Sequence, residues 1–426
     1  IDNQKQLIGK LDKKYQSIAS SNIQECENYL SRMKSGTQLL KDDDLIRKAF
    51  ALMNSAMIQQ QNRPDKVRNI FYANSEDDKH PKKNIDPIEE IDKRSSWRPF
   101  QIAFILANID STINHQSEHR DLVDLIWFPT GGGKTEAYLG LSSLSLFHTR
   151  LINPSDDGVG VLMRYTLKLL TAQQFERASR LILSMELLRK KDPELLGKKS
   201  FSIGIWVGLT VTPNTHSNKS GSIKDFNEMK NEKKDSNYKF VLTSCPWCKS
   251  FIGKLDEKSL EGLTSDQKKN FKIQGIVNNN SKVYLKCSNP NLQECPFTNF
   301  LPIYFVDEDI YSEKPSLIVS TVDKFARIVM KPQAKSMFSL DDDTKSPPNL
   351  IIQDELHLIT QALGSIVGLY ETIIERFCSK KVDDFYVGPK IIAATATIKN
   401  YKSQINNLYA RDSVIFPPQS LDIRDS

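Results

Sequence analysis

The chain has 426 residues, of which 39% are apolar and 26% are charged. This balance excludes a membrane-embedded bundle and a wholly disordered chain, and no apolar run approaches the roughly 18 residues that cross a bilayer. The net charge of +6 is too small for a protein that simply coats nucleic acid, although it permits a basic groove. The length predicts two or three domains. Because cysteines are few and the polar start does not resemble a signal peptide, we expect a cytoplasmic protein without a membrane partner.

Residues 1–95 form a polar region in which helical periodicity is the main pattern. Apolar residues recur at four-residue steps between Leu45 and Met57, and the acidic residues at 42–44 suit a helix start, where they meet the positive end of the helix dipole. The simplest interpretation is a helical brace without an active site. Residues 74–94 are dense in charge and contain two prolines, which predicts a linker.

From Trp97 onward, short apolar runs alternate with helical stretches. This alternation predicts an α/β fold with a doubly wound parallel sheet. Two polar stretches between residues 214 and 314 lack the apolar residues that would let them fold by themselves, and we assign this range as an insert. The expected domains are therefore a helical region with linker (1–95), the two parts of one α/β domain (96–213 and 315–412), the insert (214–314) and a linker (413–426).

A glycine-rich segment after the apolar run 122–128 has the pattern of a phosphate-binding loop. Gly131, Gly132 and Gly133 let the backbone approach phosphates closely, and the helix that follows adds the positive end of its dipole. Lys134 is expected to reach the β and γ phosphates of ATP, and the Thr135 hydroxyl to bind Mg²⁺. The opening glycine of the usual pattern is missing, since Phe128 stands there. A chance glycine-rich turn would not explain the lysine and threonine that follow.

Two carboxylates follow a second apolar run at 350–353. Asp354 is placed to hold Mg²⁺, and Glu355 is the candidate base for the attacking water. His357, two residues further on, can couple this site to a neighbouring element. Such residues at the carboxyl end of a strand suit a doubly wound sheet, in which ligands bind at that edge. A pair of acidic residues after a strand is common, and it gains meaning here from the phosphate loop.

Several strings, taken together, resemble the superfamily 2 helicases and translocases. Residues 130–135 look like motif I, residues 354–357 like the DEAH-type motif II, residues 395–397 like motif III, and residues 97–101 like the upstream glutamine motif. The resemblance implies a RecA-like fold, in which Gln101 reads the adenine and His357, Thr395 and Thr397 couple hydrolysis to movement. It also implies a set of nucleotide-binding residues: Gln101, Thr130, Gly131, Gly132, Gly133, Lys134, Thr135 and Glu136.

A narrower resemblance is to the helicase subunit of the DISARM antiphage defence system. It rests on residues 164–177, 320–326, 353–359 and 368–371, and it covers residues 97 to about 398. It implies a bacterial protein that uses ATP and Mg²⁺ on DNA, single-stranded or duplex with a single-stranded end, together with a companion DISARM subunit. The implied nucleic-acid track consists of Arg164, Thr166, Lys168, Gln173, Thr321 and Lys324, whose residue types contact phosphates without reading sequence. Outside this motif context, the basic residues among them would be read as an ordinary solvated face.

Four cysteines lie close together in the insert. Cys245 and Cys248 form a C-x2-C knuckle, and Cys287 and Cys295 supply a second, wider pair. Four thiolates suit tetrahedral Zn²⁺ in a structural role. The alternative is four reduced thiols in a loop-rich insert.

The leading hypothesis is the ATP-binding motor domain of a DNA helicase or translocase in antiphage defence. The alternative is a nucleotide-gated DNA-binding module without unwinding activity, and a metabolic P-loop kinase would leave the helicase motifs unexplained. Motors of this superfamily need a second RecA-like domain with an arginine finger. No candidate for it is found in these residues, and we expect the chain alone to bind nucleotide and to hydrolyse it weakly or not at all.

Overall fold

The structure is a computed structural model of the chain, and it describes residues 1–73, 81–88, 96–128, 133–166, 168–231, 239–326, 328–397 and 399–419. Within these ranges, the side chains of residues 168–172 and 329 are not described. No described helix is long and apolar enough to cross a membrane.

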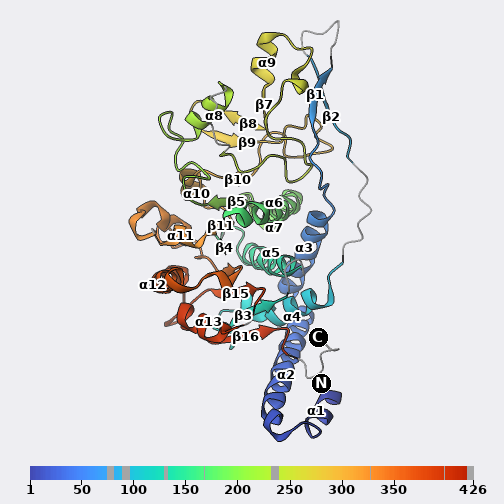
Figure 1. Ribbon diagram of the computed structural model, residues 1–426, viewed down its shortest axis with the longest axis vertical. Helices are drawn as coiled ribbons and strands as arrows, with labels where there is room; N and C mark the ends of the chain where they lie inside the picture. The colour runs from blue at the N-terminus through green and yellow to red at the C-terminus, as the bar shows by residue number, and fades with distance from the viewer. Residues whose placement is uncertain are drawn as a thin grey trace.

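An eight-stranded sheet, parallel at every strand pair, forms the centre of the molecule (Figure 1). Its strand order is β10-β5-β11-β4-β12-β15-β3-β16. Strands that pair out of chain order require crossovers, as the alternation of strands and helices predicts. The α/β doubly wound fold expected from the sequence is confirmed. The strands are β3 (Val123–Trp127), β4 (Val161–Tyr165), β5 (Ile203–Trp206), β10 (Ile303–Tyr304), β11 (Leu317–Thr321), β12 (Leu350–Gln353), β15 (Lys390–Thr395) and β16 (Ser413–Phe416).

Helices cover both faces of this sheet (Figure 1). One face carries α4 (Pro99–Ile113), α5 (Lys134–Ile152), α6 (Lys168–Lys191) and the short α7 (Pro193–Leu196). The other carries α10 (Asp307–Glu313), α11 (Val322–Phe325), α12 (Gln361–Cys378) and α13 (Tyr401–Tyr409), and the hairpin of β13 (Lys380–Val382) and β14 (Phe385–Val387) follows α12.

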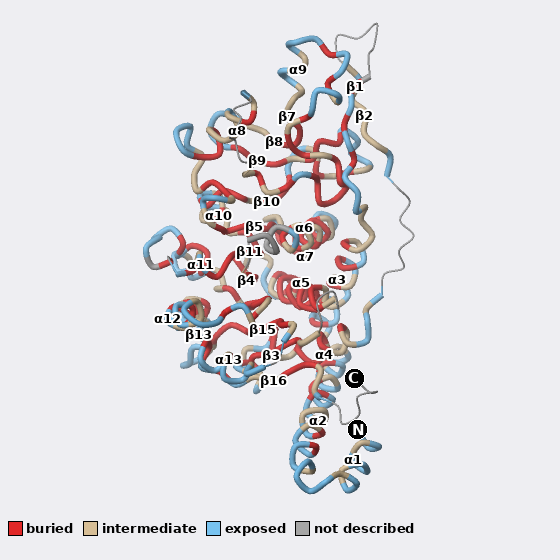
Figure 2. Tube along the Cα trace, in the orientation of Figure 1, coloured by how far each residue is buried: buried red, intermediate tan, exposed pale blue. Residues whose placement is uncertain are grey.

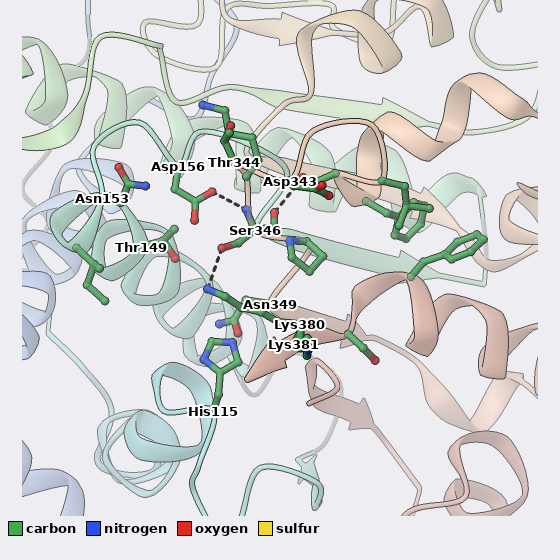
Figure 3. Close-up of a pocket in the computed structure, with 18 of the residues that line it drawn as sticks. His115, Thr149, Asn153, Asp156, Asp343, Thr344, Ser346, Asn349, Lys380 and Lys381 are labelled. Atoms are coloured by element: carbon green, nitrogen blue, oxygen red, sulfur yellow. Dashed lines mark hydrogen bonds between the residues drawn. The ribbon is translucent and has the colours of Figure 1, made fainter. Parts of the chain in front are cut away.

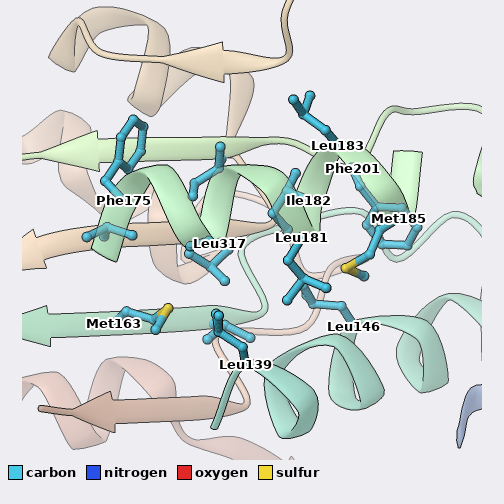
Figure 4. Close-up of a cluster of buried hydrophobic side chains, with 14 of the residues drawn as sticks. Leu139, Leu146, Met163, Phe175, Leu181, Ile182, Leu183, Met185, Phe201 and Leu317 are labelled. Atoms are coloured by element: carbon cyan, nitrogen blue, oxygen red, sulfur yellow. The ribbon is translucent and has the colours of Figure 1, made fainter. Parts of the chain in front are cut away.

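The two faces of the sheet contribute to two separate hydrophobic clusters. Along β4, Val161 and Met163 belong to one cluster and Leu162 to the other, because successive side chains of a strand point to opposite faces. Figure 4 shows the first cluster, in which Met163 and Leu317 of the sheet lie with Leu139 of α5 and Leu181 of α6. The buried residues accordingly gather in the strands and in α5 (Figure 2).

The N-terminal helices form an outer layer over the face of the sheet that carries α4, α5 and α6. They are α1 (Asp2–Ile8), α2 (Lys13–Asp42) and α3 (Asp44–Gln61). Asp43 caps α3 by accepting hydrogen bonds from the backbone N–H groups of Leu45 and Ile46, which confirms the expected helix start. α2 packs on α4, and α3 packs on α5 and α6. The helical brace is therefore part of the main body.

The expected insert forms a compact region at one end of the sheet (Figure 1). Contrary to expectation, its polar stretches contain regular elements that pack around the four cysteines and a small apolar cluster. It also takes in an antiparallel hairpin of β1 (Ile70–Ala73), just before the expected linker, and β2 (Lys82–Ile85), within it. Its remaining elements are α8 (Ser222–Lys230), β6 (Gly253–Lys254), the 3-10 turn Lys258–Leu260, α9 (Ser265–Phe271), β7 (Ile273–Gln274), β8 (Ile276–Asn278) and β9 (Val283–Leu285).

Two expected domain boundaries differ from the structure. β10 lies inside the range 214–314, yet it pairs with β5 as one edge strand of the main sheet. β16 lies in the expected linker 413–426, yet it pairs with β3 as the other edge strand. Both segments are short, so each contains few apolar residues from which a strand could be predicted. An edge strand also pairs on one side only, which requires a less extensive apolar pattern than a strand in the middle of the sheet.

Candidate nucleotide site

The carboxyl ends of β3, β15 and β12 lie side by side, and the candidate site is built there. In the register of the sheet, Thr395 pairs with Trp127 and Ala393 pairs with Gln353. The last residues of three strands that are far apart in sequence therefore meet at one edge. This is the edge at which open α/β sheets bind ligands.

α5 starts at this edge, directly after the glycine-rich segment. Thr130, Gly131 and Gly132 lie outside the described residues. Gly133 is described, with φ +92°, a left-handed conformation that glycine adopts without strain. Gln101 of α4 is buried; its Nε2 donates to the carbonyl oxygen of Gly133 at 2.8 Å, and its Oε1 accepts from the N–H of Arg98 at 2.9 Å. Gln101 thus lies beside the loop and holds its end, while the reading of adenine by Gln101 stays a prediction.

Lys134 places its ammonium between two strand ends. Its Nζ donates to the carbonyl oxygen of Phe128 at 2.8 Å and to that of Thr395 at 3.1 Å. Burial lowers the pKa of Lys134, while the carboxylates of Glu355 and Asp354 oppose that effect. The lysine of the predicted phosphate loop and the two predicted carboxylates are therefore close enough to interact.

Asp354 is buried directly after β12 and is tied to α5 through Tyr138. The Tyr138 hydroxyl donates to Asp354 Oδ2 at 2.8 Å, and the Thr135 Oγ1 lies 3.2 Å from the same phenol oxygen. A phenol has one proton, and a carboxylate can only accept, so the tyrosine proton belongs to Asp354. Burial raises the pKa of Asp354, and the hydrogen bond from Tyr138 opposes this. The two residues expected to bind Mg²⁺ thus share one neighbour.

Glu355 adopts an uncommon backbone conformation beside this carboxylate. Its φ is +49°, in the left-handed region, which costs a residue with a Cβ of the order of 1–3 kcal/mol. Its Oε2 lies 3.4 Å from His357 Nδ1, and the hydroxyl of Thr395 lies 3.2 Å from the same nitrogen. Thr395 Oγ1 in turn donates to the carbonyl oxygen of Thr397 at 2.9 Å. The three residues predicted to couple hydrolysis to movement therefore form one chain of contacts that reaches Glu355.

Glu136, in the first turn of α5, lies beside Gly133 at the end of the loop, and its part in nucleotide binding stays a prediction. Its carboxylate forms an ion pair with Arg177 of α6 and is therefore already engaged. Sequence reasoning also missed Tyr138, which lies one helical turn beyond Thr135. The spacing of three residues on a helix was the available signal, because residues i and i+3 lie on the same face.

The predicted nucleic-acid residues are for the most part not at the surface. Arg164 is completely buried and pairs with Glu371 of α12, and Thr321 is buried as well. Lys324 donates to Asp307 at 2.7 Å and to the carbonyl oxygen of Val207 at 2.8 Å. In this arrangement none of the three is available to a phosphate, and we correct their role to a structural one: Arg164 joins α12 to β4, Lys324 of α11 joins α10 to the segment after β5, and Thr321 is enclosed at the end of β11.

The remaining residues of the predicted track differ from these three in their exposure. Gln173 is exposed at the start of α6, and Thr166 is half-buried with no hydrogen-bond partner for its hydroxyl among the described residues. The side chain of Lys168 lies outside the described residues.

The four clustered cysteines converge as a possible metal site. All four Sγ atoms lie within 4.8 Å of one another, with 3.8 Å between Cys245 and Cys295 and 3.4 Å between Cys248 and Cys287. Zn–S bonds of about 2.3 Å in a tetrahedron place sulfur atoms about 3.8 Å apart. The four cysteines are free of disulfides and buried, so the donor set and its spacing fit Zn²⁺.

A cavity of about 680 Å³ lies at the opposite edge of the sheet, near the amino ends of β4 and β12 (Figure 3). It is lined by groups of both charges, among them Asp156, Lys380 and Lys381, and by His115, whose pKa burial lowers to about 4. Asp156 and Lys380 are both engaged with Ser346, at 2.8 and 3.1 Å. None of the predicted site residues lines this cavity, so the candidate site remains at the carboxyl edge.

The parallel sheet with helices on both faces is the RecA-like fold expected from the sequence. No protein-family model matches the chain. The chain is 35% identical, over 443 aligned positions, to the DISARM protein DrmA of Bacillus paralicheniformis, which confirms the resemblance drawn from the motifs. The alignment covers 95% of this chain and 37% of that protein, so the chain spans little more than a third of the relative's length.

Solved helicase structures are also similar, at low sequence identity. The DUF1998 helicase MrfA bound to DNA matches with 11% identity and a TM-score of 0.37, over 75% of this chain and 27% of that one. The helicase Lhr of Mycobacterium smegmatis, bound to ssDNA and AMP-PNP, matches with 13% identity and a TM-score of 0.38, over 74% of this chain and 25% of that one. The fold assignment itself depends on the sheet topology.

Proposed function

We propose that this chain is the ATP-binding motor domain of a superfamily 2 DNA helicase or translocase that acts in bacterial antiphage defence. The observation that carries the proposal is the convergence of Lys134, Thr135 and Asp354 at one sheet edge, where Tyr138 links Thr135 to Asp354 and Lys134 binds the carbonyl oxygens of Phe128 and Thr395. The similarity to a DISARM protein DrmA supports the defence role and a companion subunit of the same system.

In the proposed ATP hydrolysis, each of these residues has a separate role. Lys134 binds the terminal phosphates, and Thr135 and Asp354 hold Mg²⁺, which stabilises the charge that develops on those phosphates. Glu355 orients the attacking water and accepts its proton. His357 and Thr395 join this carboxylate to the end of β15, so a change at Glu355 reaches Thr397 through the contacts described above.

The test is DNA-stimulated phosphate release. In a protein of the relative's full length, DNA should accelerate ATP hydrolysis, and Glu355→Gln should abolish the acceleration while ATP still binds. The loss should be at least 100-fold, the lower end of what a positioned general base contributes. Glu194→Gln, the same change at an exposed carboxylate of α7 outside every motif, is the matched control and should leave the rate unchanged. DNA binding without any turnover in the unaltered protein would instead support a nucleotide-gated binding module.

We also propose that the four cysteine thiolates hold a structural Zn²⁺. The donor set offers four ligands and no open position, which is typical of structural zinc sites. The ion would fix the knuckle of Cys245 and Cys248 against the segment that carries Cys287 and Cys295.

A further inference from the structure

A basic pocket lies in the insert, away from the candidate nucleotide site. Its volume is about 460 Å³, within the range of small-ligand sites. Four lysines from separate parts of the chain line it: Lys83 of β2, Lys230 of α8, Lys269 of α9, and Lys286 directly after β9. No aspartate or glutamate lines it.

This excess of positive charge is local. The whole chain is nearly balanced, with 58 basic and 52 acidic residues, so four lysines without a single carboxylate do not follow from composition. Lys83 donates to Gln274 Oε1 at 2.6 Å and also to the carbonyl oxygen of Ser288, and both acceptors are neutral. Among the described residues, no carboxylate pairs with Lys230, Lys269 or Lys286. The pocket therefore attracts an anion.

Aromatic and amide side chains complete the lining. Phe226 of α8 and Phe271 of α9 contribute to the wall, and Asn278 and Asn289 add hydrogen-bonding groups. Lysines that neutralise phosphates beside aromatic rings on which bases stack are the combination that binds single-stranded nucleic acid without reading its sequence. Both rings are half-buried, and each packs partly against a hydrophobic cluster, Phe271 against Tyr72 among others, so each adds only the rest of its surface to the pocket wall. A phosphate ester with a base attached fits this lining better than a bare anion does, because a base can cover that apolar surface.

We propose that this pocket binds one nucleotide unit of a single DNA strand, as a contact separate from the motif-derived track. The proposal rests on the proposed function, since it assumes that DNA is the substrate. It gives the insert a role in holding the strand, and it supplies phosphate-binding lysines that the buried Arg164 and the paired Lys324 do not supply.

Lysines near thiolates also balance the negative charge of those thiolates, and the experiment must separate this role from DNA binding. Cys287 also lines the pocket, and the nearby Lys83 and Lys286 partly balance its charge. Lys230 and Lys269 come from the two helices, and Lys269 is exposed. These two lysines are therefore the positions to change.

The experiment measures binding of a fluorescent, single-stranded oligonucleotide of about 20 nucleotides by anisotropy, without ATP and at several salt concentrations. Lys230→Glu with Lys269→Glu should weaken binding about tenfold and should reduce the slope of log K against log salt by about 1.4, because each phosphate contact on a single strand contributes about 0.7. Lys224→Glu with Lys258→Glu changes the charge of the same insert equally, outside the pocket, and should have a much smaller effect.

Equal binding by the two double variants would overturn the proposal while leaving the proposed motor function intact. No binding by the unaltered protein would contradict both. If the Lys230 and Lys269 double variant contains less zinc but binds DNA with unchanged affinity, these lysines serve to balance the charge of the thiolates. If tripolyphosphate displaces a fluorescent label bound in the pocket and the oligonucleotide does not, the pocket binds free phosphates. Photocrosslinking of a 4-thiothymidine oligonucleotide to the unaltered protein needs no variant: it should label residues 269–278, and labelling elsewhere alone would contradict the proposal.

Discussion

Tyr138 is the residue that joins the two parts of the candidate nucleotide site. It comes from α5, and its hydroxyl donates to Asp354, which follows β12. A hydrogen bond to a carboxylate stabilises the ionised form and lowers its pKa. Because burial raises the pKa of Asp354, the tyrosine keeps a buried carboxylate able to bind a cation near neutral pH.

Tyr138→Phe should therefore shift the acid limb of the pH–rate profile for ATP hydrolysis to higher pH. A hydrogen bond to a charged group contributes about 1.5–3 kcal/mol, which corresponds to a shift of about 1–2 pH units. The sign follows because the variant lacks the group that favours ionised Asp354, so deprotonation needs a higher pH. Tyr165→Phe is the control, since Tyr165 contacts the Tyr138 hydroxyl at 3.5 Å and forms no hydrogen bond with Asp354. Profiles that coincide for the two variants would argue against this role of Tyr138.

At the scale of single residues, the sequence predicts chemistry better than it predicts exposure. Lys134 could be named because it follows three glycines after an apolar run, and Asp354 and Glu355 because that phosphate-loop pattern gives meaning to an otherwise common acidic pair after a strand. Arg164 and Lys324 were predicted as phosphate contacts from residue type and motif position. Their buried partners, Glu371 and Asp307, come from distant parts of the chain, and only the fold shows that these cations are already paired.

At the scale of elements, a buried ionic cluster holds the N-terminal brace to the sheet. Asp124 of β3 is completely buried; it pairs with Arg32 of α2 at 2.8 Å and with Lys390 of β15 at 2.7 Å. The Tyr29 hydroxyl, also on α2, lies 3.3 Å from the same carboxylate. Burial favours the protonated acid, but Lys390 and Arg32 outweigh it and lower the pKa of Asp124 to about 2.

Asp124→Asn should destabilise the protein by about 3–5 kcal/mol, because it leaves two buried cations without their anion. Urea unfolding at pH 7 measures this difference. Asp44→Asn is the control: its carboxylate pairs with Arg47 at the surface, where ion pairs contribute about 1 kcal/mol or less. The depressed pKa also means that the stabilisation from Asp124 is present above its ordinary pKa of 3.8 and is lost as the pH falls towards 2. A cost in the variant no larger than that of the control would contradict this account.

The strands of the sheet interior could be predicted, and its edges could not. The interior strands β3, β4 and β12 are apolar runs buried on both faces, a pattern that parallel sheets impose. β10 has two residues and β16 has four, and each depends on a neighbour that lies far away in sequence. The hairpin β1–β2 escaped prediction because β1 is a short apolar run of four residues, its partner β2 is polar, and the apolar side chains of β1 pack on the distant insert.

At the scale of the whole molecule, the insert and the sheet share one hydrophobic core. The cluster that contains Cys245 and Cys287 is continuous with Ile203 and Ile205 of β5. Ion pairs add to this connection: Lys249, next to the knuckle, pairs with Glu176 of α6, and Arg68 pairs with Glu294 of the insert. The insert is therefore not an independently packed domain, although the sequence predicts an insertion between the two parts of the sheet domain.

This continuity determines what removal of zinc should do. Elemental analysis should find about one Zn per chain. Chelation, or Cys245→Ser, should lower the stability of insert and sheet together in a single unfolding transition. A ligand bound only by the folded state and present at about 1,000 times its Kd stabilises by about 4 kcal/mol, and this is the loss expected. Cys26→Ser, in α2 and outside the cluster, is the control.

Hydrogen exchange should accelerate in residues 240–304 and also in α6, because Glu176 loses a fixed partner at Lys249. Exchange that accelerates in the insert alone would show that the two regions unfold separately, contrary to the shared core.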